Sequence, residues 1–530
     1  MVGITRARGC ETCRKRKIRC GLEQPSCAQC IKSKRVCAGY RRYPIFIQHT
    51  VTDGTKAESA VRHETANLSS RTGATAQQQQ AETSKPIETP TVNTDSLLPL
   101  LSLSFLVGHI NPHPALRQQL LEEYLSLYCP KAHLGPMQRR LWLFQLPIMP
   151  HMNLALEVSM MALCVAKLSD VYHDPTLRYE SLRLYHRGIH QLQKALWDPK
   201  LMYHEQTLAA CIALATYEMS QCPNESKQGY VSHTSGCEKL IQLRGPDAHT
   251  DGLAHQVFVQ FRIQGILYAL DTQQSTFLSD SVWQKVPWRK NPKTVFDQVY
   301  DFVIIAPELH RQGAMLKYMD PGDQLRLATE MIAKCWKMDG DLASFYDRLV
   351  KSHTGPLYWP QLACGYILDE DKDDELIFPV AFHFANLSVA STVLVFWACQ
   401  AMLWQGMIQL YRLMDELRDT LRNSSNNDAY GKNAELMSEP QADTKCFDLP
   451  ALEHRADFAA PARNIFQSVE YCLMDEMKDH GPKTIAASLR IAMEILRPHA
   501  PYRREMLWAE EAMAKIQARS LRLLVYYTGG

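Results

Sequence analysis

The sequence predicts three parts: a small metal-stabilised cluster domain, a disordered linker and a large all-α domain. Six cysteines fall within the first forty residues, in two halves of identical spacing. A polar stretch without apolar periodicity follows. In the rest of the chain, apolar residues recur at the three- and four-residue steps of a helix. We expect the parts to span residues 1–43, 44–95 and 96–530.

The cysteines follow the pattern C-x2-C-x6-C-x6-C-x2-C-x6-C. Each half offers a C-x-x-C pair, the spacing at which two thiolates reach one tetrahedral zinc ion. Six thiolates complete two four-coordinate sites only if two sulfurs each bind both metals. The sequence therefore predicts two Zn²⁺ ions held by Cys10, Cys13, Cys20, Cys27, Cys30 and Cys37.

The residues around these cysteines are strongly basic. Residues 1–43 hold twelve Lys and Arg side chains against two Glu, a net charge of +10, whereas the whole chain carries +2. Because a cluster of two Zn²⁺ and six thiolates carries only about −2, the basic surplus faces outward. Double-stranded DNA, through its phosphate backbone, is the predicted partner.

On these residues the segment resembles the DNA-binding domain of the fungal binuclear zinc cluster transcription factors. The resemblance covers about forty residues and includes the basic run at 14–19 and the sequence Pro25-Ser26-Cys27. It implies that Cys10 and Cys27, the first and fourth cysteines, bridge the two zinc ions.

The resemblance also implies how DNA is contacted. Lys17, three residues before the third cysteine, would read bases of a CGG-type triplet in the major groove, with help from Arg16. The other basic residues would mostly contact phosphate and set the register: Arg14, Lys15, Arg19, Lys34 and Arg35.

Three other uses of the cysteines are disfavoured. A disulfide framework requires a secretory route, and residues 1–6 show no apolar signal core. A thiol-redox pair needs one C-x-x-C and no basic loop, and a zinc knuckle used only for protein contacts would not need ten surplus positive charges. About forty residues also cannot bury a self-sufficient core, so zinc binding is expected to supply the folding free energy, on the order of 10 kcal/mol.

Residues 44–95 read as a flexible linker. Gln77–Gln80 and scattered Ser, Thr and Pro replace the apolar residues. No sustained heptad occurs there, so the linker gives no support to a dimer, and dimerisation stays open.

The remaining residues predict an all-α domain. Leu182, Tyr185, Ile189, Leu192 and Leu196 form one apolar helix face. Residues 384–403 are apolar enough to span a bilayer, but polar residues interrupt them, so a buried helix is favoured and no membrane partner is expected. Three pairs that read as helix starts are Asp174-Pro175, Asp198-Pro199 and Asp320-Pro321.

This region resembles, through residues 208–218, 233–246 and 468–482, the fungal-specific transcription factor domain. The resemblance implies a regulatory region that restrains activity, binds transcriptional co-regulators or senses a small-molecule effector.

The function expected is that of a nuclear, sequence-specific regulator of RNA polymerase II genes. Relatives of this kind commonly regulate biosynthetic gene clusters. The alternative is a ligand- or co-regulator-binding helical scaffold, tethered to chromatin with little sequence choice. An enzyme is not expected, because the chain has no G-x-S-x-G, P-loop, H-E-x-x-H or dinucleotide motif.

Overall fold

The structure, a computed structural model, describes residues 11–18, 20, 27–33, 35, 37, 114–130, 132–135, 141–365, 376–429 and 449–524. The chain separates into two compact units, Met1–Asp53 and Gly54–Gly530. The predicted linker at 44–95 lies outside the described residues, as do Cys10, Arg19 and Lys34. Of Arg14 only the backbone is described.

The first unit contains two short helices, α1 (Glu11–Lys15) and α2 (Ala28–Lys32). Its buried residues are Cys13, Cys27 and Cys30, against which Cys20 and Cys37 pack. No aliphatic or aromatic side chain belongs to this cluster within the described part of the unit. The core of the small unit is therefore made of sulfur, as expected for a domain folded by metal.

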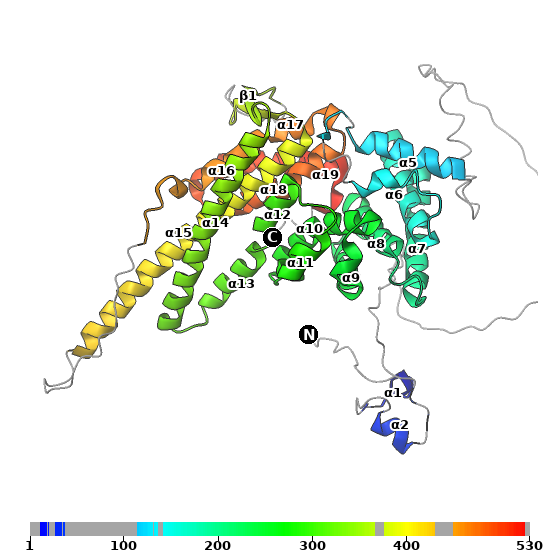
Figure 1. Cartoon of the computed structure of the whole chain (residues 1–530), viewed down its shortest axis with the longest axis horizontal. Helices are drawn as coiled ribbons and strands as arrows, with labels where there is room; N and C mark the ends of the chain where they lie inside the picture. Colours follow the sequence, from blue (N-terminus) through cyan, green and yellow to red (C-terminus); the bar gives the residue numbers. More distant parts are fainter. Residues whose placement is uncertain are drawn as a thin grey trace, which may run out of the picture. The chain divides into compact units, whose positions relative to one another are not determined.

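The second unit is built almost entirely of helices, drawn from cyan to red in Figure 1. One group consists of α5 (Pro114–Tyr128), α6 (Leu154–Tyr172), α7 (Pro175–Trp197), α8 (Glu205–Gln221) and α9 (Gln228–Arg244). Helix α8 lies at its centre, in contact with α6, α7, α9 and α10, and every residue from Leu208 to Ala215 has an exposed fraction of 0%. The apolar, small-residue composition of this stretch explains why it can be enclosed on all sides.

Helix α7 forms as predicted. Asp174 caps it, accepting hydrogen bonds from the backbone N–H groups of Thr176 and Leu177, and Pro175 is the first helical residue. On the predicted face, Tyr185 and Leu192 are buried, and the other three residues pack partly buried against the same core.

Asp320-Pro321 likewise begins a helix, α14 (Pro321–Ser352), but the prediction for Asp198-Pro199 is wrong. Asp198 ends α7, and its Oδ1 accepts a hydrogen bond from the N–H of Lys200 within a turn. The next helix begins only at Glu205, where the Nδ1 of His204 accepts from the N–H of Gln206. An aspartate side chain that accepts a hydrogen bond from the N–H two residues later occurs both in turns and at helix starts. The pair Asp-Pro alone therefore does not distinguish a turn from the start of a helix.

A middle group joins the first helices to the last ones. It comprises α10 (Gly252–Thr272), α11 (Ser281–Lys285), the 3-10 turn η6 (Val286–Trp288), α12 (Val295–Val303) and α13 (Ala306–Leu316). Helix α10 contacts α8 and α9 of the first group as well as α12 and α13.

The longest helices, α14 and α15 (Leu387–Ala429), run side by side in Figure 1. They are antiparallel, because Tyr346 stacks on Phe396 whereas Trp336 donates to the hydroxyl of Tyr411 at 2.9 Å. By length and composition, 387–420 could cross a membrane, but 78% of its most apolar window is buried inside the unit. This matches the buried helix predicted for 384–403, although the helix begins at Leu387.

The described part of the chain adds one element that the prediction of an all-α domain did not include. Strands β1 (Tyr358–Leu362) and β2 (Val380–Phe384) form a two-stranded antiparallel sheet, with Trp359 opposite His383. Tyr358 packs its ring against Trp397 of α15, so the sheet lies on the helical core.

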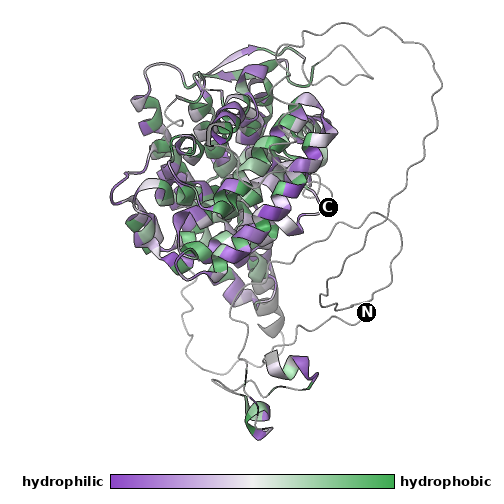
Figure 2. Ribbon diagram, turned by 90° about the vertical axis from the view of Figure 1, so that its right-hand side faces the viewer, coloured by the Kyte–Doolittle hydropathy of each residue, from purple (hydrophilic) through white to green (hydrophobic). Residues whose placement is uncertain are grey.

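The last helices are α16 (Ala459–Gln467), α17 (Val469–Leu473), α18 (His480–Leu496) and α19 (Arg503–Ser520), followed by the 3-10 turn η10 (Arg522–Leu524). One continuous hydrophobic core extends from Leu120 to Leu521. Figure 2 shows hydrophobic and hydrophilic residues on the same helices, the pattern of amphipathic helices that share a core.

Candidate metal centre and nucleic-acid interface

The sulfur core of the small unit is positioned by its two helices. Cys13 lies in α1 and Cys30 in α2, and Cys27 occupies the position before α2. The Sγ of Cys27 accepts a hydrogen bond from the N–H of Cys30 at 3.4 Å and lies 3.6 Å from the Sγ of Cys13. The two helices thus bring these sulfurs together at one place in the small unit.

The five described cysteines form two overlapping groups. Cys13, Cys20 and Cys27 make one group, Cys27, Cys30 and Cys37 the other, and within each the sulfurs lie within 4.8 Å of one another. Zinc–sulfur bonds of about 2.3 Å in a tetrahedron place sulfurs about 3.8 Å apart, so these separations suit zinc. Cys27 is the cysteine that the two groups share. Cys10, the sixth predicted ligand, lies outside the described residues.

The two halves of the unit repeat each other with an offset of 17 residues. In the first half, the N–H of Arg16 donates to the carbonyl of Thr12, and that of Ile18 to the carbonyl of Cys13. In the second half, Ser33 donates to Gln29 and Arg35 to Cys30. Each cysteine-bearing helix therefore ends in the same wide turn, and Arg16 and Ser33 occupy equivalent places.

Lys17 lies in that first turn with a φ of +54°, in the left-handed region. A residue at this position after a helix is usually glycine, because side chains other than glycine are strained there. Lys17 thus ends the helical path of α1 in a strained backbone conformation, and its side chain is exposed.

The structure describes the side chains of only some of the predicted DNA-contacting residues. Lys15, Arg16, Lys17 and Arg35 are all exposed. Arg16 does more than face solvent, because its Nη1 donates a hydrogen bond to the Oγ of Ser33 at 3.0 Å. Of Arg14 nothing is described beyond the backbone, and Arg19 and Lys34 fall outside the described residues.

Positions that are equivalent under the 17-residue offset differ in charge between the two halves. Positions 14–17 are basic without exception, whereas the equivalent positions 31–34 read Ile-Lys-Ser-Lys. Ile31 is 64% exposed, which would place an apolar side chain where the first half offers Arg14. The first half is therefore better suited to a phosphate backbone.

Sequence reasoning did not single out Ser33 or Lys32. Lys32 is exposed in the last turn of α2, and Ser33 ends that helix. The signal that could have found Ser33 is the repeat itself, because it makes Ser33 the counterpart of Arg16.

A part of each unit matches a known protein family. Residues 8–44 match the fungal Zn(2)-Cys(6) binuclear cluster domain, and residues 119–299 match the fungal specific transcription factor domain. The chain therefore carries a zinc-binding, DNA-binding domain of the fungal binuclear cluster family, together with a fungal specific transcription factor domain. Both families are families of transcription regulators rather than enzymes.

Two relatives share parts of the chain. An uncharacterized protein of Emericella nidulans is 30% identical over 133 residues, which is 25% of this chain and 28% of the relative. An uncharacterized transcriptional regulatory protein of Schizosaccharomyces pombe is 58% identical over 36 residues, 7% of either chain. The chain thus aligns with less than a third of the length of these relatives. No solved structure matches it.

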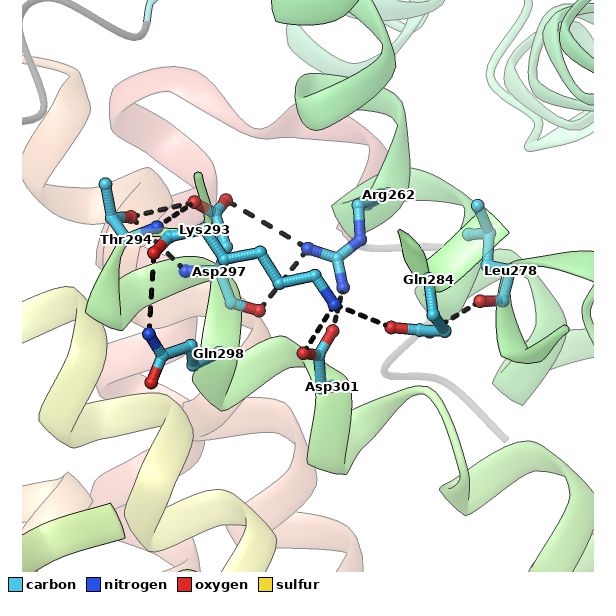
Figure 3. A network of polar contacts seen from close by, with 8 residues as sticks. All are labelled: Arg262, Leu278, Gln284, Lys293, Thr294, Asp297, Gln298 and Asp301. Atoms are coloured by element: carbon cyan, nitrogen blue, oxygen red, sulfur yellow. Dashed lines mark hydrogen bonds and ion pairs between the residues drawn. The ribbon is translucent and has the colours of Figure 1, made fainter. Parts of the chain in front are cut away.

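The transcription factor domain match ends within α12, at a buried polar network that joins α10 to α12 (Figure 3). Arg262 of α10, 3% exposed, donates to Asp301 at 2.6 Å, and Lys293 approaches the same carboxylate at 2.7 Å. The guanidinium group of Arg262 also lies over the ring of Trp288, 5.0 Å from its centre. Two positive charges balance Asp297 and Asp301, so the network serves as a joint and leaves no net charge for a ligand.

The predicted small-molecule effector finds little room in a hollow beside β2, which is lined by side chains that include Phe378, Phe466, Glu470 and Trp508. The enclosed volume of this hollow is about 10 Å³, close to the space that one water molecule needs. Small-molecule pockets are far larger, at about 300 Å³ or more. An effector therefore stays a prediction.

Proposed function

We propose that the protein is a nuclear, sequence-specific DNA-binding regulator of RNA polymerase II transcription that reads CGG-type triplets. The observation that best supports this is the exposed basic run Lys15–Lys17, which begins at the last residue of the helix bearing Cys13 and continues into the turn after it. A rigid, metal-held turn can present such side chains at fixed positions, and Lys or Arg can donate to guanine O6 and N7 in the major groove.

The proposed metal centre contains two zinc ions. One would be held by Cys10, Cys13, Cys20 and Cys27, and the other by Cys27, Cys30, Cys37 and Cys10. The sharing of Cys27 between the two sulfur groups supports its assignment as a bridging ligand. When bound, the metal supplies the folding free energy that a domain without an apolar core lacks.

The proposed interface assigns base reading to Lys17, assisted by Arg16. Phosphate contacts that set the register are assigned to Arg14, Lys15, Arg19, Lys34 and Arg35. Salt-dependent affinity would come from the phosphate contacts, and sequence choice would come from Lys17.

The helical unit is proposed to be the regulatory part of the chain, through transcriptional co-regulators or a small-molecule effector, with target genes in a biosynthetic gene cluster. We place the domains at residues 1–43 and 96–530, with a linker at 44–95.

Selection of randomised duplex DNA by the zinc-loaded full-length protein tests this function. Enrichment of a CGG-type triplet is expected, and the number and spacing of its copies report whether one or two chains bind. Tight, salt-sensitive binding without enrichment would contradict the proposal and favour a helical scaffold tethered to chromatin.

A further inference from the structure

The two halves of the zinc-binding unit are joined by a side-chain contact besides their shared sulfur. The Nη1 of Arg16, at the end of α1, donates to the Oγ of Ser33, at the end of α2, at 3.0 Å. The Oγ of Ser33 in turn lies 2.7 Å from the carbonyl oxygen of Gln29. These contacts connect the end of the first helix to the backbone of the second.

The hydrogen-bonding roles in this chain of contacts are determined by its chemistry. A serine hydroxyl has one proton and two lone pairs, whereas a guanidinium group only donates. Ser33 therefore gives its proton to the backbone carbonyl and accepts from Arg16. The bond to Arg16 is charge-assisted, which makes it stronger than a bond between neutral groups.

Arg16 and Ser33 are equivalent residues under the 17-residue repeat. Each is the residue whose N–H donates to the carbonyl four residues earlier, at the point where its helix gives way to the wide turn. Their contact therefore joins corresponding places of the two halves, and Arg16 is the covalent neighbour of Lys17.

We propose that Arg16 and Ser33 form an interlock that positions Lys17, so that Arg16 acts chiefly as a positioning residue rather than as a second base reader. This inference rests on the proposed function of sequence-specific DNA binding. One guanidinium donor is used by Ser33, and the remaining donors stay available for a phosphate oxygen. The interlock fixes the orientation of the first turn relative to the second half, and with it the direction from which Lys17 meets the groove.

The test compares Arg16→Ala, Ser33→Ala and the double variant in the full-length, zinc-loaded protein. The quantity measured is the ratio of affinity for the duplex that the wild type selects to affinity for random duplex, at one salt concentration. Ser33→Ala changes no charge, yet it is expected to lower this ratio about 3- to 10-fold, the effect of losing one hydrogen bond. Arg16→Ala is expected to lower the ratio equally, and the double variant no further, because both changes break the same contact.

Arg16→Ala should also weaken binding to random duplex, since it removes a positive charge, whereas Ser33→Ala should not. Ser33→Thr keeps the hydroxyl and is expected to retain the wild-type ratio. An unchanged ratio in Ser33→Ala, or a double variant that loses the product of the two single effects, would overturn the interlock.

A second readout does not depend on DNA. The rate at which zinc passes to a chelator should rise by the same factor in Arg16→Ala and Ser33→Ala, and Ser33→Thr should match the wild type. Equal release rates in all four proteins would also contradict the interlock. If the wild type itself shows no preference for any sequence, the proposed function fails, while the release rates still decide whether the two halves are joined in this way.

Discussion

Lys17 makes two separable contributions, one from its backbone and one from its amine. The backbone, at a φ of +54°, ends α1 with a turn that glycine would form without strain. The exposed amine is the proposed base-reading group. A lysine in a strained conformation, where glycine would fit without strain, is consistent with the proposed role of its side chain.

Substituting Lys17 can separate these contributions. Lys17→Ala and Lys17→Gly should both weaken binding by about 1–3 kcal/mol, at one base pair of the selected duplex. The glycine variant should resist unfolding better than the alanine variant by about 1 kcal/mol, because only alanine keeps the strain. Affinities across single-base variants of the duplex and thermal unfolding of both proteins provide the measurements. Equal losses on selected and random duplex would remove Lys17 from base reading.

Cys27 offers a stoichiometric test of the metal centre. Since its sulfur belongs to both cysteine groups, Cys27→Ala should abolish binding of both zinc ions. Cys30→Ala, which alters one group, should retain one ion, and Cys472→Ala, buried in the helical unit, should retain two. Zinc per chain after gel filtration gives the result. Two ions retained in Cys27→Ala would disprove a bridging role.

Among the elements, the joint between α10 and α12 lies at the end of the matched transcription factor domain, and α12 in turn contacts the long helices α14 and α15. The Arg262 guanidinium is buried with two carboxylates, and burial lowers its pKa while Asp301 and Asp297 oppose that effect. Removing the Arg262 side chain would leave the carboxylates of Asp297 and Asp301 with one positive charge fewer, in an environment that water solvates poorly.

Arg262→Met should therefore destabilise the helical unit by about 3–5 kcal/mol. Arg289→Met is the matched control: Arg289 pairs with Asp247 at 3.1 Å, but the two side chains are 63% and 79% exposed. The control should cost less than about 1 kcal/mol, because exposed pairs contribute little. Urea unfolding of both variants measures the difference, and equal costs would show that the joint does not depend on the buried pair.

Prediction of individual elements from sequence succeeded where the pattern was long. The 3.6-residue periodicity of α7 and its Asp-Pro start agree with the structure, because the apolar face and the cap both belong to local sequence. The turn at Asp198 was mispredicted, because the same dipeptide serves turns and caps. Strands β1 and β2 were missed: they are five residues each and are paired across a long connection, which leaves little local signal.

At the scale of the whole molecule, two buried histidines link stability to pH. Burial lowers the pKa of His249 to about 4, and burial, with a smaller effect of Lys483, lowers that of His480 to about 4. Unfolded histidine titrates near 6.5, so between pH 6.5 and 4 the unfolded chain binds protons that the folded chain excludes. Stability is then fully present above about pH 6.5 and decreases as pH falls toward 4.

The double variant His249→Gln and His480→Gln should show a shallower loss of stability between pH 7 and 5 than the wild type. Each group contributes at most about 1.4 kcal/mol per pH unit. The exposed His190→Gln variant is the control and should keep the wild-type slope. Urea midpoints across the pH range supply the measurement, and identical slopes in the double variant and the wild type would refute the assignment.

The metal centre was more predictable than the architecture around it. The spacing of cysteines predicts metal ligands directly from the sequence. The sulfur atoms of the five described cysteines were therefore expected to lie close together, as they do. The Arg16–Ser33 contact was not predicted, because it depends on how two helix ends face each other. The buried joint at Arg262 was missed for a related reason: its partners are 35 to 39 residues away along the chain.

The end of the described chain packs against its early helices. Arg522 of η10 donates to Asp170 of α6 at 2.6 Å, and Leu523 is buried beside Ala215 and Tyr230. These partners are separated by as many as 352 residues, so at about 5–20 residues per second the ribosome needs roughly 20 to 70 s between them. During that interval the surfaces of α6 and α8 that contact η10 in the folded protein are not yet covered. Protection by chaperones would therefore matter most during synthesis, and C-terminal deletions would impair folding before they report on regulation.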